Sequence, residues 1–143
     1  MGLAASIIIP THNRADILRH SIPRLFAQTI SSDRYEIIVV DDASGDDTAD
    51  VVNGFAQPNL FYRRQEVNRG AGAARNVAIA LSKGECLVFL DDDAFVRPDF
   101  LERHLAAHEN AASLIVTGPI VRRHKNWPAQ ARQRSHRRST PTP

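Results

Sequence analysis

The fold follows from the stretch Glu85-Cys86-Leu87-Val88-Phe89-Leu90-Asp91-Asp92-Asp93, in which a short apolar run precedes three consecutive carboxylates. The apolar residues 87–90 are too few for the core face of a helix and predict a buried strand. A parallel strand that is covered on both faces has a continuous apolar run instead of an alternating one. We therefore expect this strand to be buried on both faces, with the acids just past its carboxyl end, where open α/β sheets bind ligands.

Three adjacent carboxylates repel one another unless a cation joins them. Oxygen ligands suit a hard ion such as Mg²⁺ or Mn²⁺, and such an ion commonly keeps coordination positions for substrate phosphates. The alternative is a solvated acidic turn, because acidic side chains are mostly exposed. The strand directly before Asp91, Asp92 and Asp93 favours a functional site over such a turn.

Apolar runs and amphipathic segments alternate along the rest of the chain. Runs rich in β-branched residues predict strands at residues 6–9, where Pro10 is expected to end the strand, and at residues 35–40. Helical spacing of apolar residues predicts a helix at residues 16–28, with Pro23 as a kink or a second start. The other predicted elements are helices at 46–55, at 73–81 with Gly84 as its C-cap, and at 98–110, and short strands at 60–64 and 114–117.

This alternation predicts an α/β fold with a mostly parallel sheet and helices on both faces. The 143 residues fit one domain, at residues 1–121, followed by a tail at residues 122–143. The single cysteine, Cys86, excludes a disulfide framework within the chain. We find no run that resembles a membrane span or a signal peptide in the sequence, and therefore expect a cytoplasmic protein.

Charge is distributed unevenly along the chain. Residues 1–121 hold 11 basic and 16 acidic side chains, whereas residues 122–143 hold seven basic and no acidic ones. The tail has Trp127 as its one large apolar residue and is expected to be disordered or loosely docked. A basic tail can attract nucleic acid or anionic lipid. Because the body is acidic, we expect no nucleic-acid partner and keep peripheral membrane association of the tail as an alternative.

Polar residues follow three of the predicted strands directly. Residues 11–14 follow the first strand, Asp41 and Asp42 follow the second, and residues 91–93 follow the strand after the Gly-rich helix. In a parallel sheet these loops project from the same edge into one crevice. The crevice would combine hydrogen-bonding groups for a base or ribose, a cation site, and a basic group in Arg14 or Arg75.

The glycine-rich segment Gly70-Ala71-Gly72-Ala73-Ala74-Arg75 is similar to the dinucleotide fingerprint G-x-G-x-x-G only in part. Arg75 stands where the third glycine belongs, and the segment is not in the first strand–helix unit. Hydride transfer is therefore disfavoured. We expect the two glycines to let the backbone pass close to a ligand, while a helix beginning near Ala73 presents Arg75 and Asn76.

Four blocks of the sequence together resemble the family 2 glycosyltransferases, in order and in spacing. They are residues 6–14, residues 38–44, residues 69–76, and residues 89–93 with their Asp-x-Asp motif, and the resemblance spans residues 5 to about 121. It implies a GT-A nucleotide-sugar-binding fold, dependence on Mn²⁺ or Mg²⁺, and transfer of a sugar with inversion. The donor would be a nucleotide-diphosphate sugar, with UDP preferred, and the acceptor an unknown saccharide, lipid or polymer.

The resemblance also implies roles for individual residues. Asp42 would accept a hydrogen bond from the base, Asp92 would bind the ribose, and Asp93 would hold the metal that bridges the diphosphate. The base pocket would be lined by Pro10, His12 and Asn13, and Arg75 would approach the nucleotide. The predicted nucleotide-binding set is completed by three residues of the same blocks, Thr11, Arg14 and Asp91.

One part of the family pattern is not found. Inverting transfer needs a general base on the acceptor hydroxyl, and the family supplies it from an acid well downstream of the Asp-x-Asp motif. After Asp99 the only acids are Glu102 and Glu109, both expected on an exposed helix face. We therefore expect the acceptor-binding half to be missing, and the alternative function is a non-catalytic nucleotide-sugar-binding module or a truncated remnant. His104 and His108 are expected on the same exposed face and not in a metal site.

Overall fold

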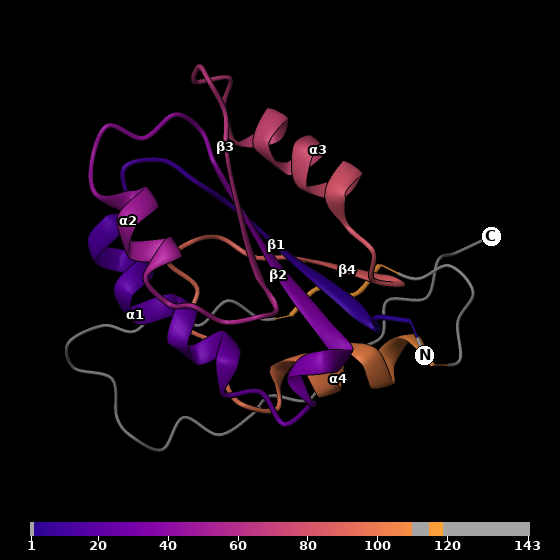
Figure 1. The fold of residues 1–143 in the computed structure, drawn as a ribbon. Coiled ribbons are helices and arrows are strands. Elements are labelled where there is room, and N and C mark those ends of the chain that lie inside the picture. Colours follow the sequence, from indigo (N-terminus) through magenta and orange to yellow (C-terminus); the bar gives the residue numbers. More distant parts are fainter. Residues whose placement is uncertain (1, 110–114, 119–143) are drawn as a thin grey trace, which may run out of the picture.

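The computed structural model describes residues 2–109 and 115–118. Its centre is an all-parallel sheet of four strands in the order β3-β2-β1-β4, as Figure 1 shows. The strands are β1 (Ala5–Thr11), β2 (Tyr35–Asp41), β3 (Leu60–Arg64) and β4 (Cys86–Phe89). The helices are α1 (Ala15–Phe26), α2 (Thr48–Asn53), α3 (Ala71–Leu81) and α4 (Phe100–His108), with a short 3-10 turn at Ser32–Arg34.

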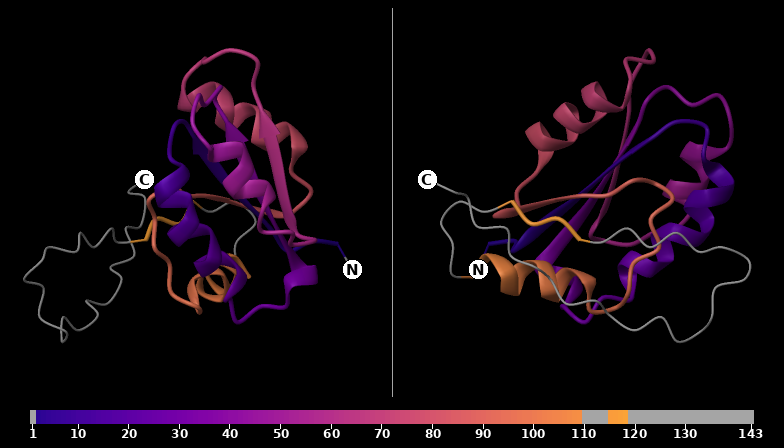
Figure 2. Two further views of the ribbon diagram at one scale, coloured as in Figure 1. Left: turned by 60° about the vertical axis from the view of Figure 1, so that its left-hand side comes forward. Right: turned by 180° about the vertical axis from the view of Figure 1, so that it is seen from behind.

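Alternation along the two central strands divides the core into two layers. Ile7 and Ile9 of β1 join a cluster with residues of α1, α2 and α4, whereas Ile8 joins a second cluster with Ala74 and Ala78 of α3. Successive side chains of a strand point to opposite faces, so a continuous apolar run serves both layers. The two further views in Figure 2 show the sheet between α3 on one side and the other helices on the opposite side. The predicted α/β fold with a parallel sheet covered on both faces is confirmed.

The prediction that Pro10 ends the first strand is wrong, because β1 continues to Thr11. Pro10 still pairs with Val40 of β2, and Thr11 pairs with Asp41. On the other side of β1, the ladder with β4 closes with the hydrogen bond from Leu90 N–H to the Ile8 carbonyl oxygen. Proline has no N–H to continue that second ladder. Pro10 therefore ends only the pairing with β4.

The prediction that the 87–90 strand is buried on both faces is also wrong. Within the described residues β4 is an edge strand that pairs only with β1. Leu87 is 36% exposed and Phe89 49% exposed, whereas Val88 is buried. The reason is that α3 packs its buried alanines on β1 and β2, and leaves that face of β4 uncovered by a helix.

Gly84 is not the C-cap of the third helix. That helix begins at Ala71, earlier than predicted, and ends at Leu81, where Ser82 is already extended. A Cβ atom at Gly84 would lie 2.2 Å from the backbone carbon of Ala5 and 2.4 Å from the nitrogen of Ser6. Glycine is needed there because the chain passes against β1 before it enters β4.

The remaining expectations divide between the described residues and the rest of the chain. The helices at 46–55 and 98–110 are confirmed with shorter bounds, and Pro23 lies inside α1. The predicted strand at 114–117 is wrong for residues 115–117, which form no regular element. The physical reason is that the apolar side chain of Ile115 is 93% exposed, so no burial stabilises a strand there. Leu114, the 122–143 tail and Trp127 lie outside the described residues. No helix in the described part of the chain is long and apolar enough to cross a membrane. The cytoplasmic location and the membrane association of the tail stay predictions.

Candidate functional site

The carboxyl ends of β1, β2 and β4 bring the three polar loops together. Parallel register places Thr11 opposite Asp41, and the Asp42 amide donates to the Thr11 carbonyl oxygen at 2.8 Å. The third loop joins them through Asp92, whose carboxylate accepts a hydrogen bond from the Thr11 hydroxyl at 2.9 Å. The expectation that loops from separate strands converge at one edge is confirmed by these contacts.

Asp92 is the half-buried acid of the Asp91–Asp93 segment. Besides the hydrogen bond from Thr11, its Oδ2 lies 3.9 Å from Nε of Arg14. Burial raises the pKa of Asp92, and the Thr11 hydroxyl and the Arg14 charge offset only part of that rise. Asp92 therefore faces inward, toward the loop that follows β1.

The two flanking acids are exposed. Asp91 forms an ion pair with Arg75, with 3.1 Å between Oδ1 and Nη2. Asp93 forms no hydrogen bond or ion pair with any other residue that the structure describes. The three consecutive carboxylates thus have different environments. Asp91 pairs with an arginine, Asp92 accepts a partly buried hydrogen bond, and Asp93 faces solvent.

His12 and Asn13 form a fixed pair at the start of the first loop. Nδ1 of His12 lies 2.7 Å from the Asp42 carbonyl oxygen, and Nε2 lies 3.0 Å from Nδ2 of Asn13. A carbonyl oxygen can only accept, so Nδ1 carries the proton and Nε2 accepts from the Asn13 amide. The Asn13 side-chain oxygen in turn accepts from the Gly45 amide at 2.7 Å. These bonds hold the imidazole in one tautomer and one orientation.

Asp42 is nearly fully buried and uses its carboxylate to hold the glycine-rich loop. Oδ1 accepts from the Arg69 amide and from Nε2 of Gln65, and Oδ2 accepts from the Gly70 amide, all at 2.7 Å. An ionised carboxylate has about four acceptor positions. Three of these positions are filled by the described residues, and the fourth, on Oδ2, is not.

The start of α1 depends on the loop after β2. Arg14 caps the helix without a side-chain hydrogen bond of its own. Instead its amide donates to Thr48 Oγ1 at 3.2 Å, and the Ala15 amide donates to Asp46 Oδ2 at 3.1 Å. The position of Arg14 is therefore set by residues more than 30 positions away in the sequence.

Sequence reasoning placed Asp41 in the crevice without a role of its own, and assigned no role to Ser44 or Tyr62. Asp41 is fully buried at the end of β2, where its carboxylate accepts from the Ser44 amide and hydroxyl and from the Tyr62 hydroxyl. Asp41 and Ser44 are three residues apart, a spacing typical of an aspartate that closes a turn. That signal was available in the sequence, but the contact with Tyr62 was not.

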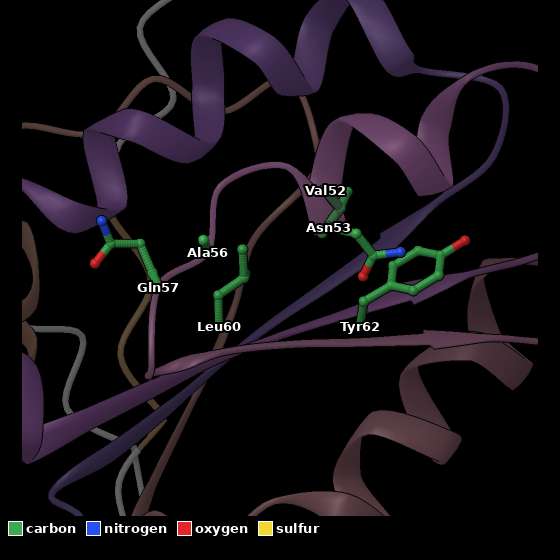
Figure 3. A pocket seen from close by; sticks show the side chains of 6 residues that line it. All are labelled: Val52, Asn53, Ala56, Gln57, Leu60 and Tyr62. Atoms are coloured by element: carbon green, nitrogen blue, oxygen red, sulfur yellow. The ribbon is translucent and has the colours of Figure 1, made fainter.

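A hollow in the described part of the chain lies away from this polar edge. It lies between α2 and β3, and Figure 3 shows Tyr62 and Gln57 at its two ends. Its other lining residues are Val52, Asn53, Ala56 and Leu60. It lacks the carboxylates and the arginines of the loops, so we assign the candidate site to the polar edge.

Comparisons with known proteins show what this chain is similar to. The family model described as Glycosyl transferase family 2 matches residues 6–142. A poly(ribitol-phosphate) beta-glucosyltransferase of Bacillus spizizenii is 38% identical over 118 residues, which cover 80% of this chain and 19% of that protein.

Two solved structures share the fold at a TM-score of 0.71 and each covers 75% of this chain. S. aureus TarS 1–349 in complex with UDP-GlcNAc is 30% identical and matches over 31% of its own length. The mannosyltransferase PcManGT from Pyrobaculum calidifontis, in complex with GDP-Man and Mn²⁺, is 28% identical and matches over 32% of its length. The present chain spans less than a third of the length of each of these proteins.

Proposed function

This chain belongs to glycosyl transferase family 2, and we propose that its polar edge binds a nucleotide-diphosphate sugar, with UDP as the nucleotide, for transfer of the sugar to an acceptor. The observation that carries the proposal is the Thr11–Asp92 hydrogen bond, which joins the loops after β1 and β4 beside Asp42. A crevice at the carboxyl ends of parallel strands is where open α/β sheets bind nucleotides. The UDP-GlcNAc complex of the related TarS supports the choice of nucleotide.

We assign roles from these positions. The remaining acceptor position of Asp42 would receive the base N–H, and the Pro10–Asn13 segment would wall the base pocket. Asp92 would bind the ribose. Arg14 and Arg75 are both within reach of the acidic segment and supply positive charge for the diphosphate.

The acidic segment fits a divalent cation of the kind that shares its ligands with a substrate. The described residues contain no group of three or more His, Cys, Asp or Glu side chains that could hold a metal by themselves. Mg²⁺ and Mn²⁺ sites of nucleotide enzymes commonly use one or two carboxylates, with substrate phosphates and water as the other ligands. Asp93, exposed and unpaired, would hold such an ion, which would stabilise the negative charge on the departing nucleoside diphosphate.

Transfer to a saccharide, lipid or polymer acceptor, with inversion, is the reaction we propose. The glucosyltransferase from B. spizizenii, whose name specifies poly(ribitol-phosphate), supports a polymeric acceptor. A second candidate function is donor binding without transfer. It is favoured by the contacts of two acids downstream of the Asp-x-Asp motif. Asp99, the N-cap residue of α4, pairs with Arg103, and Glu102 of α4 accepts a hydrogen bond from Thr29, so both carboxylates are engaged away from the polar edge.

The first experiment is titration of UDP into the purified chain by calorimetry, with and without Mn²⁺. The parent and an Asp93→Asn variant would be compared with Asp33→Asn, which removes an exposed carboxylate from the opposite end of the sheet, just before β2. We expect Mn²⁺ to strengthen UDP binding in the parent and in Asp33→Asn but not in Asp93→Asn.

Release of UDP from UDP-sugars, followed over hours, separates the two candidate functions. Slow donor hydrolysis or transfer that requires Mn²⁺ supports the transferase. Binding with no turnover for any donor supports the module that only binds. Absence of binding by a folded parent, under all conditions, would refute both.

A further inference from the structure

A buried hydrogen-bond network lies beneath the predicted nucleotide pocket. Its centre is Asp41, whose Oδ1 accepts from the Ser44 amide at 2.9 Å and from the Ser44 hydroxyl at 2.5 Å. The other oxygen, Oδ2, accepts from the Tyr62 hydroxyl of β3 at 2.5 Å and lies 4.0 Å from Nε of Arg64. A fully buried carboxylate is costly unless it is bonded in this way.

The network holds a backbone conformation that side chains other than glycine disfavour. Ala43, between Asp41 and Ser44, has a φ of 61°, and Asn13 has a φ of 52°. Such left-handed residues are strained and persist only where the surrounding structure enforces them. Here the Asp41 carboxylate closes the turn around Ala43, and the Ser44 side chain supports Asn13.

The direction of each hydrogen bond is set by the chemistry of the groups. Ser44 has one hydroxyl proton, which it donates to Asp41. Its oxygen is then the acceptor for the Asn13 amide at 2.8 Å. The Tyr62 phenol stays a donor, because burial and the Asp41 charge raise the pKa of Tyr62 well above its ordinary value. Tyr62 therefore donates directly to Asp41, and Asn13 donates to Ser44, which in turn donates to Asp41.

Asn13 carries the network to the imidazole of His12. Its side-chain amide donates to His12 Nε2 at 3.0 Å, and the Gly45 amide holds the Asn13 side-chain oxygen at 2.7 Å. Loss of the Ser44 hydroxyl would release the backbone of Asn13 and, with it, the amide that donates to His12 Nε2. Edge strand β3 is thus connected to the first loop through three side chains, those of Tyr62, Asp41 and Ser44.

We propose that Tyr62, Asp41 and Ser44 are positioning residues for nucleotide binding: they set the His12–Asn13 conformation from beneath the pocket without touching the ligand. This inference rests on the proposed function, since it assigns His12 and Asn13 to the base pocket. It adds that affinity for the nucleotide depends on a hydroxyl of β3, which is not one of the three loops.

The test compares three single variants and one double variant. Tyr62→Phe and Ser44→Ala each delete one hydroxyl of the network, and the double variant deletes both. Tyr35→Phe is the matched control, because the Tyr35 hydroxyl is also buried and donates to the Leu25 carbonyl oxygen at 2.7 Å, within the core and away from the loops. The UDP dissociation constant, the unfolding temperature and the ¹H–¹⁵N spectrum of the His12 ring would be measured for each.

We expect Tyr62→Phe and Ser44→Ala each to weaken UDP binding roughly five- to tenfold, as the loss of one hydrogen bond implies. The double variant should lose less than the product of the two factors, because both hydroxyls act through one carboxylate. The Nε2 resonance of the His12 ring should shift, because that nitrogen loses the fixed position of its donor, the Asn13 side-chain amide. Tyr35→Phe should lower the unfolding temperature and leave the affinity and the ring spectrum at parent values.

A network variant that loses stability but keeps both the parent affinity and the parent ring spectrum would overturn the inference and leave the proposed function intact. If the parent itself does not bind UDP, the proposed function fails, and with it the link to nucleotide binding. The ring spectrum of the free protein still shows in that case whether the network holds His12.

Discussion

Thr11 donates a hydrogen bond from Oγ1 to Oδ2 of Asp92 at 2.9 Å, although 81 residues separate them in the sequence. The register of the sheet explains the contact. Ile8 of β1 pairs with Phe89 of β4 in parallel, and three further residues along each chain lead to Thr11 and Asp92. Any change of register between the two strands would break this bond and move the acidic segment away from the first loop.

Thr11→Val keeps the shape of this side chain and removes its hydroxyl. We expect the free energy of unfolding to fall by about 1 kcal/mol, because the half-buried Asp92 loses its closest partner. UDP binding should weaken severalfold, since the acidic segment is no longer held to the first loop. Urea unfolding and calorimetric titration measure the two effects. Thr11→Ser, which retains the hydroxyl, should behave like the parent; equal losses in both variants would show that the bond is not the cause.

The Arg75–Asp91 ion pair is exposed, so its removal should matter for binding more than for stability. Arg75→Ala should change the free energy of unfolding by no more than about 0.5 kcal/mol. It should weaken UDP binding about tenfold, because a cation facing the diphosphate is lost. Arg103→Ala breaks a similar exposed pair with Asp99 on α4, where N and O are 2.6 Å apart, and should leave UDP binding unchanged. Equal effects of the two substitutions on affinity would contradict the placement of the site.

Asp46 accepts hydrogen bonds from the first residues of two helices, Ala15 of α1 and Thr48 of α2, and its contribution to stability should depend on pH. Burial alone would raise its pKa, but hydrogen bonds from Thr48 and from the Ala15 amide outweigh burial and lower the pKa below its ordinary value of 3.8. An acid with a lowered folded-state pKa stabilises the fold above its unfolded-state pKa, and that stabilisation is lost as the pH falls through the lowered value.

Asp46→Ala should therefore reduce the free energy of unfolding by about 1 kcal/mol at pH 7. The difference in the free energy of unfolding between variant and parent should stay constant down to the ordinary pKa of 3.8 and disappear only below that pH. Asp47 is the matched control, because it is the N-cap residue of α2 but makes no side-chain cap hydrogen bond. Thermal unfolding between pH 2.5 and pH 7 is the measurement. A difference that grows on acidification would refute the assignment.

Substitution by alanine should destabilise the protein at Gly84 and stabilise it at Gly72. A Cβ atom at Gly84 would clash with the backbone of Ala5 and Ser6, so Gly84→Ala should cost about 2–3 kcal/mol or prevent folding. Gly72 lies within α3, where a Cβ atom meets nothing within 4 Å. Gly72→Ala should stabilise the protein by about 0.5–1 kcal/mol through helix propensity. Chemical denaturation of both variants measures the two effects. A Gly84→Ala protein as stable as the parent would show that the backbone at Gly84 does not pass close to Ala5 and Ser6.

The amino-acid sequence determined the elements whose signal is local. The runs that form β1 and β2 are rich in β-branched residues, and the spacing of Leu18, Ile22 and Leu25 gives α1 one apolar face that is buried as expected. The parallel sheet follows from the alternation of such elements, because a helix between two strands returns the chain to the same end of the sheet. The position of the polar loops at one edge follows from the same geometry.

Only the tertiary structure decided how much of each element is covered and which polar groups meet. A continuous apolar run such as residues 87–90 has the same sequence whether its strand lies inside a sheet or at its edge, and it was the position of α3 that left Leu87 and Phe89 exposed. The contacts of Asp41 with Tyr62 and of Thr11 with Asp92 depend on strand order and register. Strand order and register are set by the packing of distant segments, and no local pattern of residues records them.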